Sequence, residues 1–278
     1  MTILTQSALV GLSSLAAGFL GALTGLGGGV VIVPMLTLAF GVDIRYAIGA
    51  SLVSVIATSS GAAAAYVKEG YTNLRVGMFL EIATTLGALA GAALAVVLPA
   101  GVVAVLFGLV LAGSAYLSSR PHGQYAGPDR SDRLASLLCM DSSYPGPNGP
   151  IAYHVRGIPA GFGLMFVAGS LSGLLGIGSG AVKVLALDQA MRLPFKVSTT
   201  TSNFMIGVTA AASAGIYLGR GDVDATIATP VALGVLAGAT LGARLLPRLS
   251  NRHVRLVFLP VLIVVGAQMV ARAAGIGL

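Results

Sequence analysis

The sequence predicts an all-α integral membrane protein built from two inverted structural repeats, and three observations lead to this prediction. Of the 278 residues, 56% are hydrophobic and only 9% are charged, whereas soluble domains carry about 25% charged residues. The apolar runs are long enough for transmembrane helices and exceed the ~10-residue alternating strands of a membrane barrel. The second half of the chain also repeats the first at an offset of 151 residues.

The repeat is clearest in two glycine clusters that interrupt apolar stretches. The first, at 25–29, reads Gly-Leu-Gly-Gly-Gly, and the second, at 176–180, reads Gly-Ile-Gly-Ser-Gly. Duplicated membrane proteins whose halves both carry glycine-interrupted helices are typical of secondary transporters, and the interruptions mark the substrate site. Further pairs keep the same register: Ser51 with Ser202, Tyr66 with Tyr217, Gly70 with Gly221, Gly87 with Gly238 and Gly91 with Gly242.

Each half is predicted to contain a glycine-broken re-entrant helix pair followed by three transmembrane helices. The apolar segments of the N-terminal transmembrane repeat, 1–118, lie at roughly 7–24, 27–40, 45–67, 75–98 and 100–118. Those of the C-terminal transmembrane repeat, 158–278, lie at roughly 158–176, 178–191, 195–218, 225–247 and 253–274. The polar stretch between the repeats, 119–157, is rich in Pro, Gly, Ser and Asp and is predicted to be a linker.

The first apolar pair is too long for one transmembrane helix. A single helix over 7–40 would extend about 51 Å, whereas the hydrocarbon core is about 30 Å thick. The pair therefore forms either two full spans or a hairpin of two half-helices that enters and leaves on one side. Its short second piece favours the re-entrant hairpin.

The distribution of basic residues predicts the orientation. If each half crosses the membrane an odd number of times, twelve basic residues fall on one side and three on the other; if each glycine-broken stretch crosses once, the division is eight to seven. The positive-inside rule favours the first arrangement, and with it an inverted repeat. We therefore expect a multi-pass protein of a bacterial-type inner membrane, with linker 119–157 cytoplasmic and both termini non-cytoplasmic. The twelve are Lys68, Arg75, Arg120, Arg130, Arg133, Arg156, Arg192, Lys196, Arg244, Arg248, Arg252 and Arg255, and the three are Arg45, Arg220 and Arg272.

The two helix breaks are the predicted substrate site. A helix that begins inside the membrane presents backbone N–H groups without intrahelical partners, and the positive end of its dipole favours an anion. Two such starts related by inverted symmetry would face each other near the midplane. The predicted anion-binding backbone positions are Gly27, Gly28, Gly29, Gly178, Ser179 and Gly180.

Two charged residues inside apolar runs are further candidates, because ionisable groups at membrane depth are costly and usually functional. Lys183 replaces Ile32 of the first copy; it contacts the anion, snorkels, or forms a structural ion pair with an acidic group such as Asp188. Glu81 is the only acidic residue well inside a long apolar run. It is a candidate for carrying a coupling proton, with a structural hydrogen bond as the alternative.

A polar run, Ser198–Asn203, follows the second break. Ser202 and Asn203, and Ser51 by its repeat position, are predicted to orient an oxyanion through hydroxyl and amide donors. The alternative is that these side chains cap helices or form interhelical hydrogen bonds, which are common in membranes.

At these motifs the chain resembles the TauE/SafE family of sulfite and organosulfonate exporters. The resemblance rests on 18–29 with Pro34, on 172–180, and on Leu193-Pro194-Phe195-Lys196-Val197-Ser198 leading to Thr201-Ser202-Asn203. It implies a secondary transporter that moves a small sulfur-containing oxyanion outward, with proton coupling as an option. Leu185 stands where the family usually has proline, and Lys183 and Asp188 occupy positions that are more often apolar, which suggests a subgroup with its own substrate.

Two other functions remain open, and a third lacks the residues that it needs. An anion channel or uniporter would give flux that follows voltage alone, and a partner subunit would use the glycines only for packing. A membrane-embedded enzyme needs a nucleophile–base pair or a metal cluster, and the sequence offers neither. With one cysteine, and with His122, His154 and His253 in or next to loops, we expect no metal site, no cofactor and no enzymatic activity. The expected partners are a small anion and the lipid bilayer, not nucleic acid.

Overall fold

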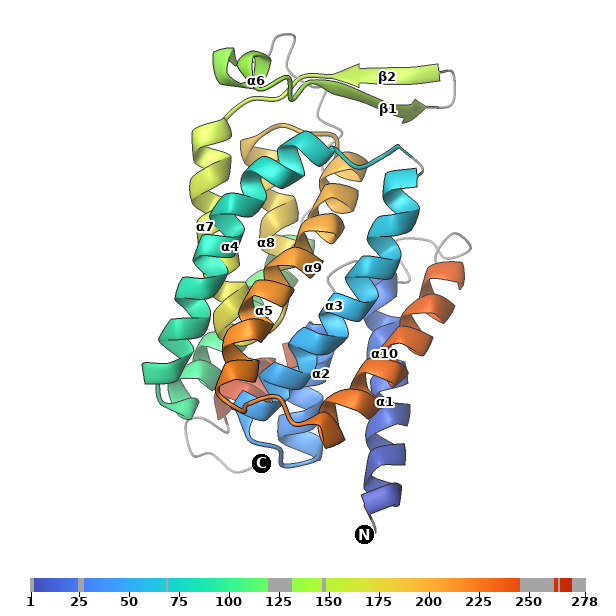
Figure 1. Cartoon of the computed structure of the whole chain (residues 1–278), viewed down its shortest axis with the longest axis vertical. Helices are drawn as coiled ribbons and strands as arrows, with labels where there is room; N and C mark the ends of the chain where they lie inside the picture. Colours follow the sequence, from blue (N-terminus) through green and yellow to red (C-terminus); the bar gives the residue numbers. More distant parts are fainter. Residues whose placement is uncertain are drawn as a thin grey trace.

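The computed structural model describes residues 3–24, 28–68, 70–119, 132–146, 149–245, 263–264 and 266–271. These residues are mostly helical (Figure 1), which confirms the helical class predicted from the sequence. The helices of the first half are α1 (Ile3–Thr24), α2 (Gly29–Pro34), α3 (Ile44–Lys68), α4 (Leu74–Val97) and α5 (Ala100–Ser119). Those of the second half are α7 (Ile158–Leu175), α8 (Gly180–Leu185), α9 (Phe195–Gly219) and α10 (Ala225–Leu245).

The two halves keep the same local structure at the offset seen in the sequence. Helix α2 continues into a π-helical segment, η1 (Met35–Ala39), and α8 continues into its counterpart η2 (Ala186–Ala190), which begins and ends 151 residues later. Helices α3 and α9 also begin and end 151 residues apart. The two turns that follow α3 and α9 both place a glycine at positive φ, Gly70 at 76° and Gly221 at 78°. The sequence repeat is therefore a structural repeat.

The halves exchange partners when they pack. Helix α1 packs against α10 and α4 packs against α7, while α3 and α9 pack against each other. Figure 1 shows the pair α4–α7 on one side of the bundle and the pair α1–α10 on the other, with α3 and α9 between them. Under the repeat, α1 corresponds to α7 and α4 to α10, so the two outer pairs are equivalent.

Glycines allow the close approach of these outer pairs. A Cβ atom added at Gly87 of α4 would lie 2.1 Å from the carbonyl oxygen of Phe166 in α7. The equivalent addition at Gly238 of α10 would lie 2.0 Å from the carbonyl oxygen of Leu15 in α1. Small residues that let backbones approach are how membrane helices associate without a hydrophobic driving force. Packing thus explains glycines that lie far from the breaks.

The interrupted helices differ in length. The continuous helical segment made by α2 and η1 covers Gly29–Ala39 and is about 16 Å long, too short for the ~30 Å hydrocarbon core. Helix α1 has 22 residues, or about 33 Å. Among the described helices, α4 with 24 residues and α7 with 18 residues are long and apolar enough to cross a membrane.

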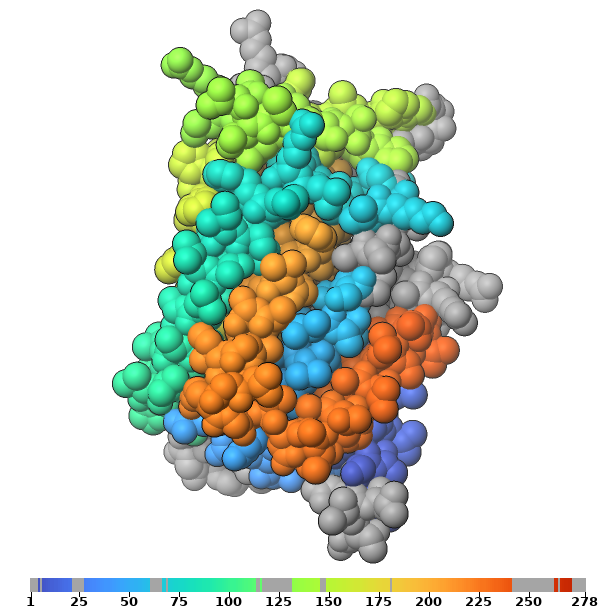
Figure 2. Space-filling view, in the orientation of Figure 1, coloured from blue at the N-terminus to red at the C-terminus, as the bar shows by residue number. Residues whose placement is uncertain are grey.

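The stretch predicted as a linker contains a folded cap. Its described part has a short helix, α6 (Arg133–Leu137), and a hairpin in which β1 (Ser142–Gly146) pairs antiparallel with β2 (Gly149–Tyr153). The cap lies across one end of the helix bundle (Figures 1 and 2). The all-α prediction did not include these strands.

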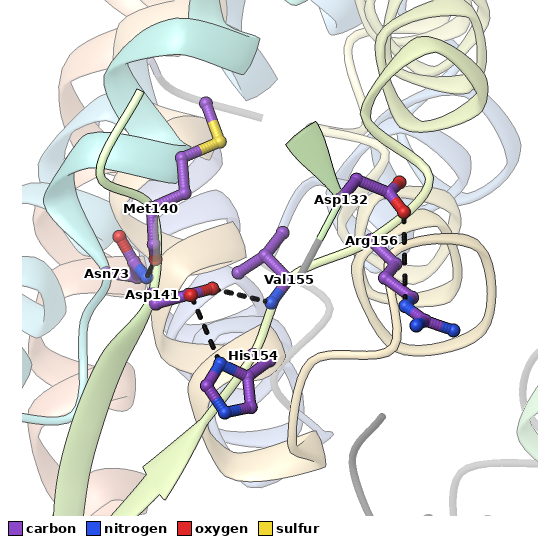
Figure 3. A network of polar contacts seen from close by, with 7 residues as sticks. All are labelled: Asn73, Asp132, Met140, Asp141, His154, Val155 and Arg156. Carbon is purple, nitrogen blue, oxygen red and sulfur yellow. Dashed lines mark hydrogen bonds and ion pairs between the residues drawn. The ribbon is translucent and has the colours of Figure 1, made fainter. Parts of the chain in front are cut away.

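The cap is attached to the bundle by buried polar and apolar contacts. Asn73 is the N-cap residue of helix α4. Its Nδ2 atom donates hydrogen bonds to the carbonyl oxygen of Met140, at 2.9 Å, and to the Tyr153 hydroxyl, at 2.8 Å. Within the cap, Asp141 accepts hydrogen bonds from the Val155 backbone N–H and from His154 (Figure 3). The cap therefore shares one core with α4, α7 and η2: Val76, Leu80, Ala135, Met140, Met165 and Leu187 belong to a single hydrophobic cluster.

Candidate functional site at the helix breaks

The second break has a backbone that only a few residue types adopt. Helix α7 ends at Leu175, and Gly176 and Gly178 follow at φ 67° and 74°. These angles favour glycine because a side chain is disfavoured there. Ser179 precedes α8 at φ 43°, an uncommon conformation for a residue with a Cβ. Backbone strain of this kind concentrates at functional sites.

The two breaks touch each other. A Cβ added at Gly29, the first residue of α2, would lie 2.8 Å from the carbonyl oxygen of Gly176 and 2.7 Å from the Ser51 hydroxyl. Gly28 and Gly29 are both buried. Gly27, which we also predicted to bind substrate, lies outside the described residues. Absence of a side chain at Gly29 is what lets the first break approach the second.

The predicted serines hold the second break. Ser51 of α3 donates a 2.7 Å hydrogen bond to the carbonyl oxygen of Gly176, and Ser202 of α9 donates a 3.4 Å hydrogen bond to that of Gly180. Both serines are fully buried, and Asn203 beside Ser202 is half-buried. Each hydroxyl therefore has a backbone partner at the break, and contact of these side chains with substrate stays a prediction.

A buried hydrogen-bonded link joins the two charged candidates. The Lys183 ammonium donates to the Thr209 hydroxyl at 2.5 Å, and this hydroxyl lies 2.7 Å from Glu81 Oε1. Lys183 and Thr209 are 0% exposed and Glu81 is 8% exposed. Because an unpaired charge in the interior is very costly, opposite charges and a bridging hydroxyl stabilise each other here.

The link combines both halves of the chain. Glu81 comes from α4, Lys183 from α8 and Thr209 from α9. From the sequence, Glu81 and Lys183 were separate candidates, Asp188 was one possible acidic partner of Lys183, and Thr209 was not among the predicted residues. A signal was available in the repeat register, where Glu81 and Lys183 align with the apolar residues Ala232 and Ile32, and Thr209 aligns with Thr58. The charges therefore occur at one of the two repeat-related positions.

Three buried oxygens around the link and the second break have no protein hydrogen-bond partner within the described part of the chain. They are Glu81 Oε2, Ser179 Oγ and Ser172 Oγ. Buried polar groups almost always have a hydrogen-bond partner. These atoms can therefore bind a small polar molecule or water. Among the described residues, no group of three His, Cys, Asp or Glu side chains is placed to hold a metal ion.

Basic residues gather at the two ends of the bundle. At the cap end, the Arg75 guanidinium donates to the carbonyl oxygen of Cys139 at 2.7 Å, and Arg156 pairs with Asp132 at 3.9 Å. Arg220 pairs with Asp222 at 3.1 Å in the turn between α9 and α10. Arg75 and Arg156 belong to the twelve residues predicted on one side of the membrane, and Arg220 belongs to the other three.

An apolar helical bundle with a charged pair buried beside two helix breaks has the features of a membrane transport protein. The family model described as "Sulfite exporter TauE/SafE" matches residues 10–269. The chain therefore belongs to the TauE/SafE sulfite exporter family, as the resemblance of its glycine motifs predicted.

Curated relatives agree over nearly the full length. The chain is 28% identical over 266 residues to the "Probable membrane transporter protein YunE" of Bacillus subtilis, covering 92% of this chain and 94% of that protein. It is also 28% identical to a "Probable membrane transporter protein" of Xylella fastidiosa, covering 91% and 90%. Identity to the "Probable membrane transporter protein MJ0441" of Methanocaldococcus jannaschii is 26%, covering 91% of each. No solved structure matches the chain.

Proposed function

We propose that this protein is a secondary transporter that exports a small sulfur-containing oxyanion, sulfite or an organosulfonate, across the inner membrane. Transport is proton-coupled and proceeds by alternating access around the two broken helices. The observation that carries this proposal is the buried Lys183–Thr209–Glu81 link beside the contacting breaks. A cation and a carboxylate at membrane depth are costly to retain and mark ion or proton pathways.

The substrate site combines the break backbones with Lys183. The N–H groups of Gly28, Gly29, Ser179 and Gly180 and the Lys183 ammonium bind the oxyanion, while Ser51, Ser202 and Asn203 orient it. Helix starts offer unpaired N–H donors and positive dipole ends to an anion. The contact between Gly29 and Gly176 supports a single site shared by both breaks.

The two halves have opposite orientations in the membrane. The exchange of partners between α1–α10 and α4–α7 supports a twofold relation between the repeats, and α2–η1 and α8–η2 serve as re-entrant half-helices. The cap lies in the cytoplasm, and both termini lie on the other side, in line with the twelve-to-three division of basic residues. Rocking of the repeats about the breaks then exposes the substrate site first to one side of the membrane and then to the other.

Binding of anions to the purified protein tests the site. The panel is sulfite, thiosulfate, sulfate, sulfoacetate, taurine, acetate and phosphate, read as thermal stabilisation, because a ligand that binds only the folded state raises its apparent stability. We expect a sulfur oxyanion to stabilise the wild type and not Lys183→Met. Loss of a charge-assisted hydrogen bond of about 1.5–3 kcal/mol corresponds to roughly ten- to hundredfold weaker binding.

Lys196→Met is the matched control, because Lys196 is exposed near the start of α9. It should bind the anions as the wild type does. Equal stabilisation of a folded Lys183→Met protein would remove Lys183 from the site. Stabilisation by none of the anions would favour a different solute or a partner-subunit role.

A further inference from the structure

We infer that Glu81 is an internal counter-ion that must be protonated before Lys183 can bind an anion, so that one proton and one monovalent anion cross together without net charge movement. This inference rests on the proposed transport function and specifies its coupling. It starts from the geometry of Thr209, whose hydroxyl lies between the two charges and a backbone carbonyl.

The Thr209 hydroxyl has two acceptors for its single proton. Its oxygen lies 2.7 Å from Glu81 Oε1 and 2.8 Å from the carbonyl oxygen of Met205, one turn earlier in α9. Lys183 donates to the same oxygen. A hydroxyl has one proton to donate and two lone pairs to accept with, so Thr209 can serve Glu81 or Met205 but not both.

Both protonation states of Glu81 satisfy this arrangement. With Glu81 ionised, Thr209 accepts from Lys183 and donates to the carboxylate. With Glu81 protonated, Thr209 accepts from Lys183 and from the carboxylic acid and donates to Met205 instead. The link can therefore gain or lose a proton without losing its hydrogen bonds.

Protonation changes the charge that the interior must hold. The ionised pair is neutral, whereas the protonated pair leaves Lys183 as an uncompensated buried cation. Such a cation is strongly destabilised unless an anion joins it. Anion and proton therefore favour each other's binding, and by linkage the effect is reciprocal.

Other charged groups are too few to replace this coupling. Lys183 is the charged residue that Thr209 joins to Glu81. Helix α7, packed against α4, has no charged residue, and α9 has only Lys196 in its first turn. On α4 itself the Arg75 guanidinium donates to the carbonyl oxygen of Cys139 in the cap, and η2 contributes one further acidic residue, the buried Asp188.

A hydroxyl that can donate to an anion lies one helical turn from Lys183. Ser179 lies one helical turn before Lys183, and its carbonyl oxygen accepts the Lys183 backbone N–H. Ser179 is 3% exposed, and its buried hydroxyl has no hydrogen-bond partner in the described structure. Glu81 Oε2 is likewise buried and unpartnered. The Lys183 ammonium and the Ser179 hydroxyl are the donors here, and they match an oxyanion that brings several acceptors.

The test uses the full-length protein in liposomes with radiolabelled methanesulfonate, a monoanion that stays ionised across the pH range used, and with sulfite alongside. With equal anion on both sides and a pH gradient of one unit, the anion should accumulate about tenfold on the alkaline side, because one pH unit is about 1.4 kcal/mol per proton. A potential set with potassium and valinomycin at equal pH should produce no accumulation. Protein-free liposomes give the leak.

Variants separate the coupling from transport itself. Glu81→Gln should lose accumulation by the pH gradient and instead accumulate anion on the positive side when a potential is set. In Thr209→Val the pH of half-maximal exchange should shift, and Thr209→Ser should restore it. Thr58→Val, which removes the repeat-related hydroxyl bonded only to helix carbonyls in the described structure, should behave as wild type.

Three outcomes would overturn the inference. Accumulation by potential in the wild type, or equal proton-driven accumulation by Glu81→Gln, contradicts one-to-one coupling through Glu81 while leaving transport intact. No flux of either anion by folded wild-type protein overturns the proposed function and the inference with it.

Discussion

Ser51 in the first half of the chain donates a 2.7 Å hydrogen bond to the carbonyl oxygen of Gly176 in the second half. This contact joins a helix that follows the first break to the backbone of the second break. It occurs because Gly29 has no side chain between them. The two breaks are thus connected by a direct hydrogen bond between the halves of the chain.

Removing the Ser51 hydroxyl should destabilise the protein more than removing that of Ser202. Ser51→Ala leaves the Gly176 carbonyl oxygen without its short hydrogen bond, which costs about 1–3 kcal/mol. Ser202→Ala should cost less, because its 3.4 Å contact with Gly180 is longer than a typical hydrogen bond. Thermal unfolding of both variants in detergent checks the order, and equal losses would contradict it.

The buried charges should depend on each other for stability. Lys183→Met alone leaves Glu81 without its counter-charge. Removing one partner of a buried ion pair lowers the free energy of unfolding by about 3–5 kcal/mol. Protonation of the Glu81 carboxylate reduces this loss. The double variant Lys183→Met with Glu81→Gln removes both charges and should recover most of the loss. A double-mutant cycle of unfolding measures this coupling. Additive effects would show that the two charges do not interact.

Glycines at helix contacts should not tolerate substitution by alanine, whereas glycines that face open space should tolerate it. A Cβ at Gly169 of α7 would lie 2.1 Å from the carbonyl oxygen of Thr84 in α4, whereas none of the described atoms lies within 4 Å of one at Gly163 of the same helix. We expect Gly169→Ala to lower the unfolding temperature clearly. Gly163→Ala should be neutral or stabilising by about 0.5–1 kcal/mol, because alanine favours helix. Equal behaviour of the two variants in thermal unfolding would argue against the α4–α7 contact.

Asn73 should govern attachment of the cap. Asn73→Ala removes a helix cap worth about 1 kcal/mol and leaves the Met140 carbonyl and the Tyr153 hydroxyl without their partner. Hydrogen exchange in 140–153 should then speed up. Asn73→Asp keeps an acceptor for the Val76 N–H but loses the donation to Met140, so it should loosen the cap with less effect on α4. Unchanged exchange in both variants would mean that apolar contacts alone hold the cap.

The site could be predicted in part because some of its features are local. Positive-φ glycines at Gly176 and Gly178, and a lysine where the repeat has Ile32, leave marks in the sequence that need no fold to interpret. Thr209 leaves no such mark, since a threonine in a helix usually bonds its own backbone, as Thr58 does. Its role depends on Glu81, 128 positions away in the chain.

The sequence by itself determined the helical membrane class, the repeat register, the two breaks and the family, because composition, periodicity and glycine patterns act within single segments. Only the tertiary structure decided which segments touch: the exchanged pairs α1–α10 and α4–α7, the folded cap on Asn73, and the meeting of Lys183 with Glu81 at Thr209. Pairing of distant charges depends on how helices pack around one another, and packing is set by the shape of whole helix faces rather than by any local pattern.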